Sequence, residues 1–119
     1  MNNILIVDDE ADICALLTEH LRKLGFKASS CLTIRDAREC ITSSPYDVIF
    51  IDLNLADGSG YELISLLKAV SNPVKIVVIS AYDSERQRAM QSGASMFVPK
   101  PFTKGTIQDV LKSLSFISS

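Results

Sequence analysis

The chain alternates between short runs of apolar, often β-branched residues and longer segments in which apolar positions recur about every 3.6 residues. The short runs predict strands at residues 4–7, 27–30, 48–51, 74–79 and 96–98, the second being the weakest. The stronger runs are nearly continuous in apolar residues, as expected when helices cover both faces of a parallel sheet. The pattern therefore predicts five strands alternating with five helices.

Helix ends are marked by residues that suit them. Asp9 is a predicted N-cap of the first helix and Gly25 follows its end, while Gly93 ends the fourth helix and Thr103 precedes the last. Strand–helix units with right-handed crossovers build an open parallel sheet, and five units are too few for a closed eight-stranded barrel. We expect an α/β, doubly wound, five-stranded parallel sheet of flavodoxin-like order 2-1-3-4-5, with five helices on both faces.

Composition limits the class of protein. The 119 residues, 47% of them hydrophobic, suit one core, so residues 1–119 are predicted to form a single domain. Twelve basic and fourteen acidic residues give a net charge of −2 without a basic cluster, which argues against direct nucleic-acid binding. No apolar run approaches the roughly 20 residues that span a bilayer, and acidic residues follow the first apolar run where a signal peptide would continue, so we expect a cytoplasmic protein without membrane contact.

Three cysteines and one histidine invite other interpretations. Cys14, Cys31 and Cys40 are odd in number and widely spaced, which predicts reduced thiols instead of a disulfide framework or a zinc site. His20 lies on the apolar side of the first helix with no second ligand nearby in sequence. We interpret it as a packed structural histidine and not as a phosphohistidine or metal ligand.

Polar residues stand at the carboxyl ends of four predicted strands. Asp8 and Asp9 follow the first strand, Asp52 the third, Ser80 the fourth and Lys100 the fifth. In open α/β sheets, ligands bind beyond these ends, where the strand order reverses. We therefore expect three carboxylates, a hydroxyl and an ammonium group in one crevice.

Such a crevice suits magnesium and phosphoryl transfer. Close carboxylates repel unless a cation is present, and Mg²⁺ prefers oxygen ligands, waters and a phosphate. Asp52 is the predicted nucleophile, because it ends the central strand and precedes a polar, glycine-rich loop at residues 54–60. Asp8 and Asp9 then hold the metal, while Lys100 and Ser80 contact phosphoryl oxygens.

These motifs resemble a known family, the receiver domain of two-component response regulators, over essentially the whole chain. The similar motifs are Asp8-Asp9, Asp52-Leu-Asn-Leu with Gly60 eight residues on, Ser80-Ala81 and Lys100-Pro101-Phe102. One departure is Ala56, where the family loop often has proline, so the loop keeps more freedom in the unfolded chain.

The resemblance implies roles for individual residues. Asp52 is similar to the phosphoacceptor, and the metal ligands would be Asp9, the Asp52 side chain and the backbone carbonyl of Asn54. Asp8 resembles the acid that reaches the metal through water. Lys100 resembles the residue that pairs with the acceptor and then with the phosphoryl group, and its bond to Pro101 resembles the family's cis peptide.

The resemblance also implies a switch. Ser80 would move toward the phosphate and Phe97, the family's aromatic position, would turn inward, although Phe97 also suits a plain core residue. The helix at residues 84–92 has only Ala89 and Met90 as apolar residues and should bury little. We expect helix 4, strand 5 and helix 5 to form the face that contacts an effector domain or output protein.

The function implied is a signalling phosphoacceptor that takes its phosphoryl group from a histidine kinase or histidine phosphotransfer protein and catalyses only its own phosphorylation and dephosphorylation. Two alternatives remain: a degenerate receiver that binds proteins without phosphorylation, and a haloacid-dehalogenase-like phosphatase. The latter resembles Asp-x-Asp after a first strand, whereas here Asn54 stands two residues after Asp52 on the third. Neither of the common glycine-rich nucleotide-binding motifs is present.

Overall fold

The computed structural model describes residues 2–69 and 74–117. Its main sheet has five parallel strands in the order β2-β1-β3-β6-β7. Their bounds are Asn3–Val7 for β1, Lys27–Cys31 for β2, Val48–Asp52 for β3, Lys75–Ser80 for β6 and Met96–Pro99 for β7. When only the five strands of this sheet are numbered along the chain, the order is the predicted 2-1-3-4-5, and the flavodoxin-like fold is confirmed.

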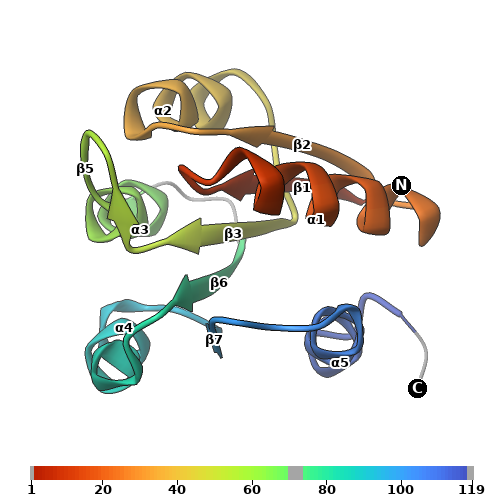
Figure 1. The fold of residues 1–119 in the computed structure, drawn as a ribbon. Helices are drawn as coiled ribbons and strands as arrows, with labels where there is room; N and C mark the ends of the chain where they lie inside the picture. The colour runs from red at the N-terminus through yellow and green to blue at the C-terminus, as the bar shows by residue number, and fades with distance from the viewer. Residues whose placement is uncertain (1, 70–73, 118–119) are drawn as a thin grey trace.

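Helices cover both faces of the sheet, as Figure 1 shows. One face is covered by α1 (Ala11–Lys23) and α5 (Lys104–Ser113), and the other by α2 (Ile34–Ser43), α3 (Gly60–Ala69) and α4 (Arg86–Ser92). Two apolar cores result, one on each side of the sheet.

The strands supply both cores at once. Along β1, Leu5 and Val7 pack on the side of α2 and α3, whereas Ile4 and Ile6 pack on the side of α1 and α5. Successive side chains of a strand point to opposite faces. The continuous apolar runs in the sequence therefore reflect a sheet that is buried on both sides.

Most helix ends follow the predicted residues. Gly93 ends α4 in the left-handed conformation at φ 118°, and Thr103 begins α5 in a capping box with Thr106. The predicted N-cap Asp9 is wrong: the cap position of α1 is Glu10, with no capping side chain of its own, and its N–H donates to Oδ1 of Asp8 over 2.8 Å. The Asp9 carboxylate lies instead beside two other acids, described below.

The loop predicted at residues 54–60 is a small antiparallel hairpin of β4 (Asn54–Leu55) and β5 (Gly58–Ser59). It leads directly into α3, and the N–H of Gly60 donates to the carbonyl of Leu53 over 2.9 Å. A Cβ atom at Gly60 would come 2.5 Å from the carbonyl oxygen of Asp52. Glycine at this position therefore lets the chain turn back immediately after β3.

The remaining expectations concern thiols, the histidine and membrane contact. The three cysteines are free, and burial raises the pKa of the Cys31 thiol to about 12. His20 is buried in α1, as expected for a packed side chain. Within the described residues, none of the helices combines the length and apolar character needed to cross a membrane.

Candidate functional site

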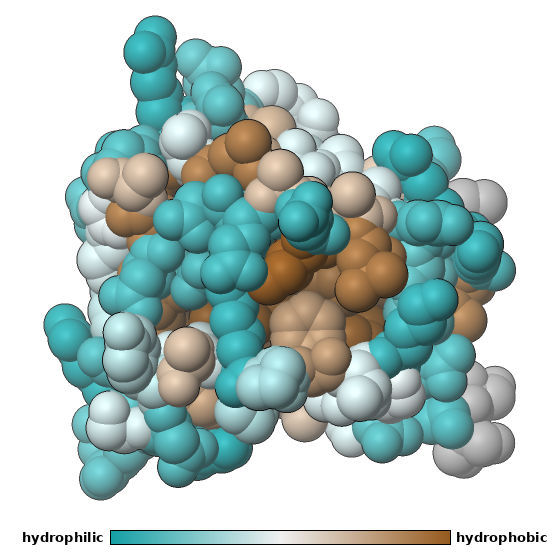
Figure 2. All heavy atoms as spheres, viewed as in Figure 1, coloured by the Kyte–Doolittle hydropathy of each residue, from teal (hydrophilic) through white to brown (hydrophobic). Residues whose placement is uncertain are grey.

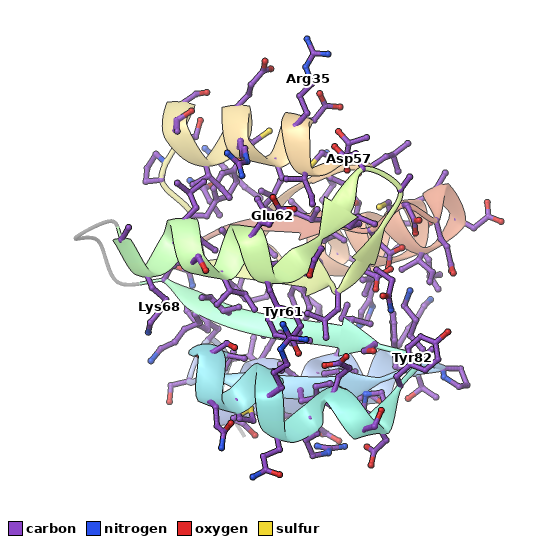
Figure 3. All side chains as sticks on the ribbon, turned by 90° about the vertical axis from the view of Figure 1, so that its left-hand side faces the viewer. Arg35, Asp57, Tyr61, Glu62, Lys68 and Tyr82 are labelled. Carbon is purple, nitrogen blue, oxygen red and sulfur yellow. The ribbon has the colours of Figure 1, made fainter. Side chains whose placement is uncertain are left out.

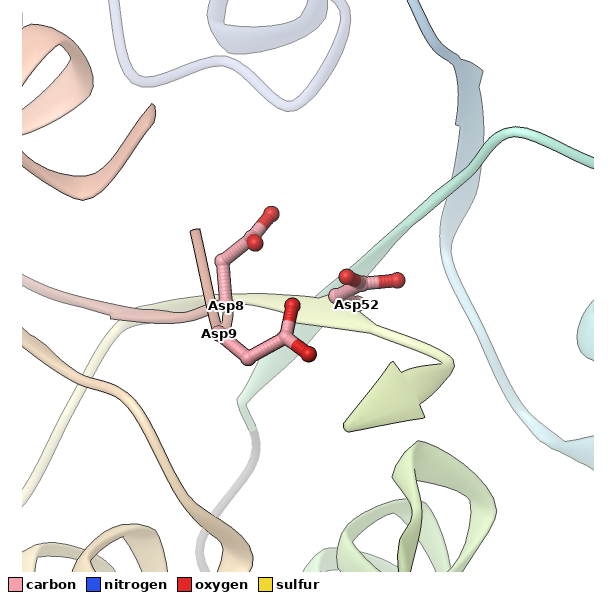
Figure 4. A group of neighbouring side chains, drawn as sticks. All are labelled: Asp8, Asp9 and Asp52. Atoms are coloured by element: carbon pink, nitrogen blue, oxygen red, sulfur yellow. The ribbon is translucent and has the colours of Figure 1, made fainter. Parts of the chain in front are cut away.

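Three acidic side chains meet at the carboxyl ends of two neighbouring strands. In the register of β1 and β3, Val7 is paired with Ile51, so Asp8, directly after β1, and Asp52, the last residue of β3, lie at the same level. One oxygen each from Asp8, Asp9 and Asp52 lies within 4.8 Å of the others, and Figure 4 shows the three side chains together. Asp8 and Asp52 are buried, whereas Asp9 is exposed.

Lys100 is the cation of this acidic cluster. It follows β7, where its backbone N–H donates to the carbonyl of Ser80 over 2.8 Å, and its peptide bond to Pro101 is cis. Its Nζ lies 3.1 Å from Oδ2 of Asp8 and 3.1 Å from Oδ2 of Asp52. A weaker contact of 3.8 Å to Glu10 was not predicted, although Glu10 directly follows the two aspartates in sequence.

The balance of charge in the site is negative. Burial raises the pKa of Asp52, and the nearby Asp8 charge adds to this effect against the opposing hydrogen bonds from Asn54 and Lys100. For Lys100, burial works against the charged form, but the hydrogen bonds to Asp8 and Asp52 outweigh it and raise the pKa of the ammonium group. One lysine thus serves two buried carboxylates, and a further cation would relieve their repulsion.

The donor atoms fit a hard divalent cation. The three acidic side chains offer only oxygen ligands, which Mg²⁺ prefers. Oδ2 of Asp8 is fully buried, and among the described residues the ammonium group of Lys100 is the one cation that it contacts. Asn54 is the first residue of the hairpin that follows β3, and its N–H donates to Oδ1 of Asp52 over 3.2 Å.

Ser80 and Phe97 lie on the two strands beyond β3. Ser80 ends β6, is fully buried, and its hydroxyl accepts a hydrogen bond of 3.0 Å from the N–H of Tyr82. Phe97 in β7 is buried in the core beneath α3 and α4. The guanidinium group of Arg86 lies over its ring, 4.7 Å from the centroid. The aromatic ring is therefore already inward while Lys100 is paired with Asp52.

The segment before and along α4 is attached mainly by polar side chains. A 3-10 turn, η1 (Asp83–Glu85), precedes α4, and Ala89 is the only residue of α4 that is buried. The Tyr61 hydroxyl on α3 donates to Glu85 over 2.7 Å, and Arg88 lies 4.1 Å from the centroid of the Tyr61 ring. The sequence predicted that this helix buries few apolar side chains. It did not predict the contacts of Tyr61 with Glu85 and Arg88, because hydrophobic periodicity does not show which polar residues of two helices meet.

All of the predicted strand-end residues thus gather at one edge of the sheet, and comparisons with known proteins agree with this geometry. The response regulator receiver domain family matches residues 4–112. The response regulator protein PilR of Pseudomonas aeruginosa is 32% identical over 109 residues, which cover 90% of this chain and 24% of PilR. The transcriptional regulatory protein PrrA of Mycobacterium leprae is 31% identical over 93% of this chain and 48% of its own length. The chain therefore spans a quarter to a half of these relatives.

Solved structures show the same fold. A CheY-like receiver domain from Methylobacillus flagellatus is 28% identical, with a TM-score of 0.87 over 96% of this chain and 98% of that one. The response regulator TrrA of Thermotoga maritima, solved in complex with Mg²⁺ and BeF, is 28% identical with a TM-score of 0.86, covering 96% and 99% of the two chains. From its fold, its strand-end cluster and these matches, this chain belongs to the response regulator receiver domains of two-component signalling.

Proposed function

We propose that the chain is a signalling switch that accepts a phosphoryl group on Asp52 in a Mg²⁺-dependent reaction. The observation that supports this most is the buried arrangement in which Lys100 bridges Asp8 and Asp52 while the third acid, Asp9, lies beside them. A structural ion pair needs one carboxylate for one lysine. Three acids for one cation leave a negative excess that suits a metal.

The residues of the chain divide the work of the transfer. One carboxylate oxygen of Asp52 attacks phosphorus, and the bond from phosphorus to the donor breaks, with its electron pair leaving on the donor. The N–H of Asn54 holds Oδ1 of Asp52 in place. The ammonium group of Lys100, now paired with Asp52, would then pair with the transferred phosphoryl group. When bound by Asp9, Asp52 and the Asn54 carbonyl, with Asp8 acting through water, Mg²⁺ would neutralise charge on the phosphoryl oxygens.

The proposed donor is a histidine kinase or histidine phosphotransfer protein. A mainly apolar groove beside Lys100 supports a protein partner, and it is lined by Glu10, Ile13, Leu16, Ala81, Lys100, Pro101 and Phe102. Leu16 is 49% exposed in this groove. In Figure 2 apolar side chains gather between α1 and α5, surrounded by polar ones. A docked helix would cover this surface and bring its phosphohistidine toward Asp52.

The proposed output begins at Ser80. A phosphoryl group on Asp52 adds acceptor oxygens that would draw the Ser80 hydroxyl away from the Tyr82 N–H and reorder the segment leading to η1 and α4. The face formed by α4, β7 and α5 would then contact an effector domain or output protein. The inward position of Phe97 in this structure indicates that its ring needs little further movement.

Intact mass spectrometry tests the proposal. We expect a single phosphoryl adduct after incubation with acetyl phosphate and Mg²⁺, and none without Mg²⁺ or in Asp52→Asn. Asp109→Asn, which removes an exposed carboxylate of α5, is the matched control and should form the adduct normally. A folded wild-type protein that forms no adduct would favour the degenerate receiver, and turnover of an external phosphoester would favour the phosphatase.

A further inference from the structure

Asp57 joins the hairpin after the phosphoacceptor strand to a different helix. It lies between β4 and β5, and its two carboxylate oxygens accept the N–H groups of Ile34 over 2.8 Å and Arg35 over 3.1 Å. These are the first two residues of α2, which has N–H groups without partners inside the helix. Figure 3 shows Asp57 on the hairpin beside the beginning of α2.

The other end of the hairpin contacts the phosphorylation site. Asn54 donates its N–H to Oδ1 of Asp52, and it is paired with Ser59 across the hairpin. The N–H of Gly60 closes the turn on the carbonyl of Leu53. A displacement of the hairpin tip would therefore move the backbone of Asn54 relative to the carboxylate of Asp52.

Apart from Leu55, which is buried in the core, the other attachments of the hairpin are weaker. The N–H of Ser59 donates to Glu62 over 3.2 Å, and Glu62 contacts Arg38 at 3.7 Å with both side chains about half exposed. Exposed pairs of this kind contribute little to stability. The family's frequent proline is replaced by Ala56, so no ring restrains the backbone at that position. The two charge-assisted hydrogen bonds that the Asp57 carboxylate accepts are the stronger polar restraint.

We propose that Asp57 is a positioning residue for the metal and phosphoacceptor site. By holding the hairpin tip against α2, it keeps the Asn54 backbone in the place where its N–H orients Asp52 and its carbonyl would be available to a bound Mg²⁺. Gly58 permits this close packing: its φ is 151°, and a Cβ atom there would lie 2.8 Å from Cδ1 of Ile34. The inference rests on the proposed function, since it assigns Asn54 a role toward Mg²⁺.

The test compares two caps of the same helix. Asp57→Ala removes the acceptor that also holds the hairpin, whereas Thr33→Ala removes the N-cap hydroxyl that accepts the N–H of Asp36 and leaves the hairpin untouched. Asp57→Asn, which keeps one carbonyl oxygen, should be intermediate. Mg²⁺ affinity is measured by calorimetry on the full chain, and amide exchange of Asn54 and Gly60 by NMR in metal-free protein.

For Asp57→Ala we expect about tenfold weaker Mg²⁺ binding, at the lower end of what outer partners of metal ligands contribute, and faster exchange at Asn54 and Gly60. Thr33→Ala should leave both quantities unchanged. Equal effects of the two substitutions, or wild-type values in Asp57→Ala, would overturn the inference. If the wild type binds Mg²⁺ but takes no phosphoryl group, the proposed function fails while the role of Asp57 is still decided. If the wild type binds no Mg²⁺, the amide-exchange measurement decides: exchange at Asn54 and Gly60 that is the same in Asp57→Ala as in the wild type overturns the inference.

Discussion

The Nζ atom of Lys100 lies 3.1 Å from Oδ2 of Asp52, a residue 48 positions earlier in the chain. Both side chains are largely buried, with exposed fractions of 13% and 6%. Asp8 forms an ion pair with the same ammonium group and is fully buried. Lys100 is therefore the counterion of two carboxylates that are almost entirely buried.

Replacing Lys100 should destabilise the metal-free protein strongly. Lys100→Met leaves two buried carboxylates without their cation, and we expect a loss of about 3 kcal/mol in the free energy of unfolding. Lys23→Met is the matched control, because Lys23 pairs with Glu19 on the surface with both side chains 67% exposed, and it should change stability by less than about 0.5 kcal/mol. Urea unfolding measures both. Equal losses would contradict the assigned role of Lys100.

Replacing Asp52 should have the opposite effect. Burial and the Asp8 charge raise the folded pKa of Asp52 above its unfolded value, so stability is lost as pH rises and the buried carboxyl group ionises. Asp52→Asn removes that cost, and Lys100 keeps Asp8 as a partner. We expect the metal-free variant to be more stable by about 1 kcal/mol and to gain less from added Mg²⁺. A less stable variant would show that the ion pair outweighs the repulsion.

Ser80→Ala should separate phosphorylation from its propagation. The variant keeps Asp52 and Lys100, so it should still take up the phosphoryl group. It loses the hydroxyl that now accepts the Tyr82 N–H and that we expect to move. Hydrogen exchange across η1 and α4 should therefore respond to phosphorylation in the wild type and not in Ser80→Ala. Ser95→Ala, which removes a hydroxyl that accepts the Ile76 N–H, should respond like the wild type.

Tyr61→Phe should change the alkaline limb of the stability profile. Burial and the hydrogen bond to Glu85 raise the pKa of Tyr61 to about 12. The unfolded phenol ionises near pH 10, so the contribution of this group is present below pH 10 and is lost as pH rises toward 12. Denaturation between these values should show a shallower decline in Tyr61→Phe, with Glu85→Gln intermediate. An unchanged slope would argue against the Tyr61–Glu85 contact.

Much of the fold follows from local patterns in the sequence. Runs such as residues 48–51 are apolar on both faces, and this alone indicates a covered parallel sheet with its polar residues at the strand ends. Asp8 and Asp52 could be placed together because neighbouring parallel strands end at the same edge. The cis bond before Pro101 came from resemblance and has no such local rule.

Side chains that act across elements could not be predicted in the same way. Asp9 has the residue type and position of an N-cap, but the acidic cluster places its carboxylate elsewhere. From the sequence alone, Asp57 in its glycine-rich loop has the character of a turn residue. Only the folded chain brings it to the start of α2, 23 positions away in sequence. The charges around α4 suggest a solvated helix, yet Arg86 and Arg88 lie on aromatic rings. Such pairings depend on the distances between helices, which periodicity does not define.

The most direct measurement locates the phosphoryl group. After treatment with acetyl phosphate and Mg²⁺, borohydride reduces an aspartyl-phosphate to homoserine, and tryptic peptides are then sequenced by mass spectrometry. Asp8 and Asp9 precede Arg22, whereas Asp52 lies between Arg38 and Lys68, so they fall in different peptides. We expect homoserine at position 52 alone. Homoserine at position 8 or 9, or unmodified peptides from a folded protein that binds Mg²⁺, would contradict the assignment of Asp52 as the phosphoacceptor.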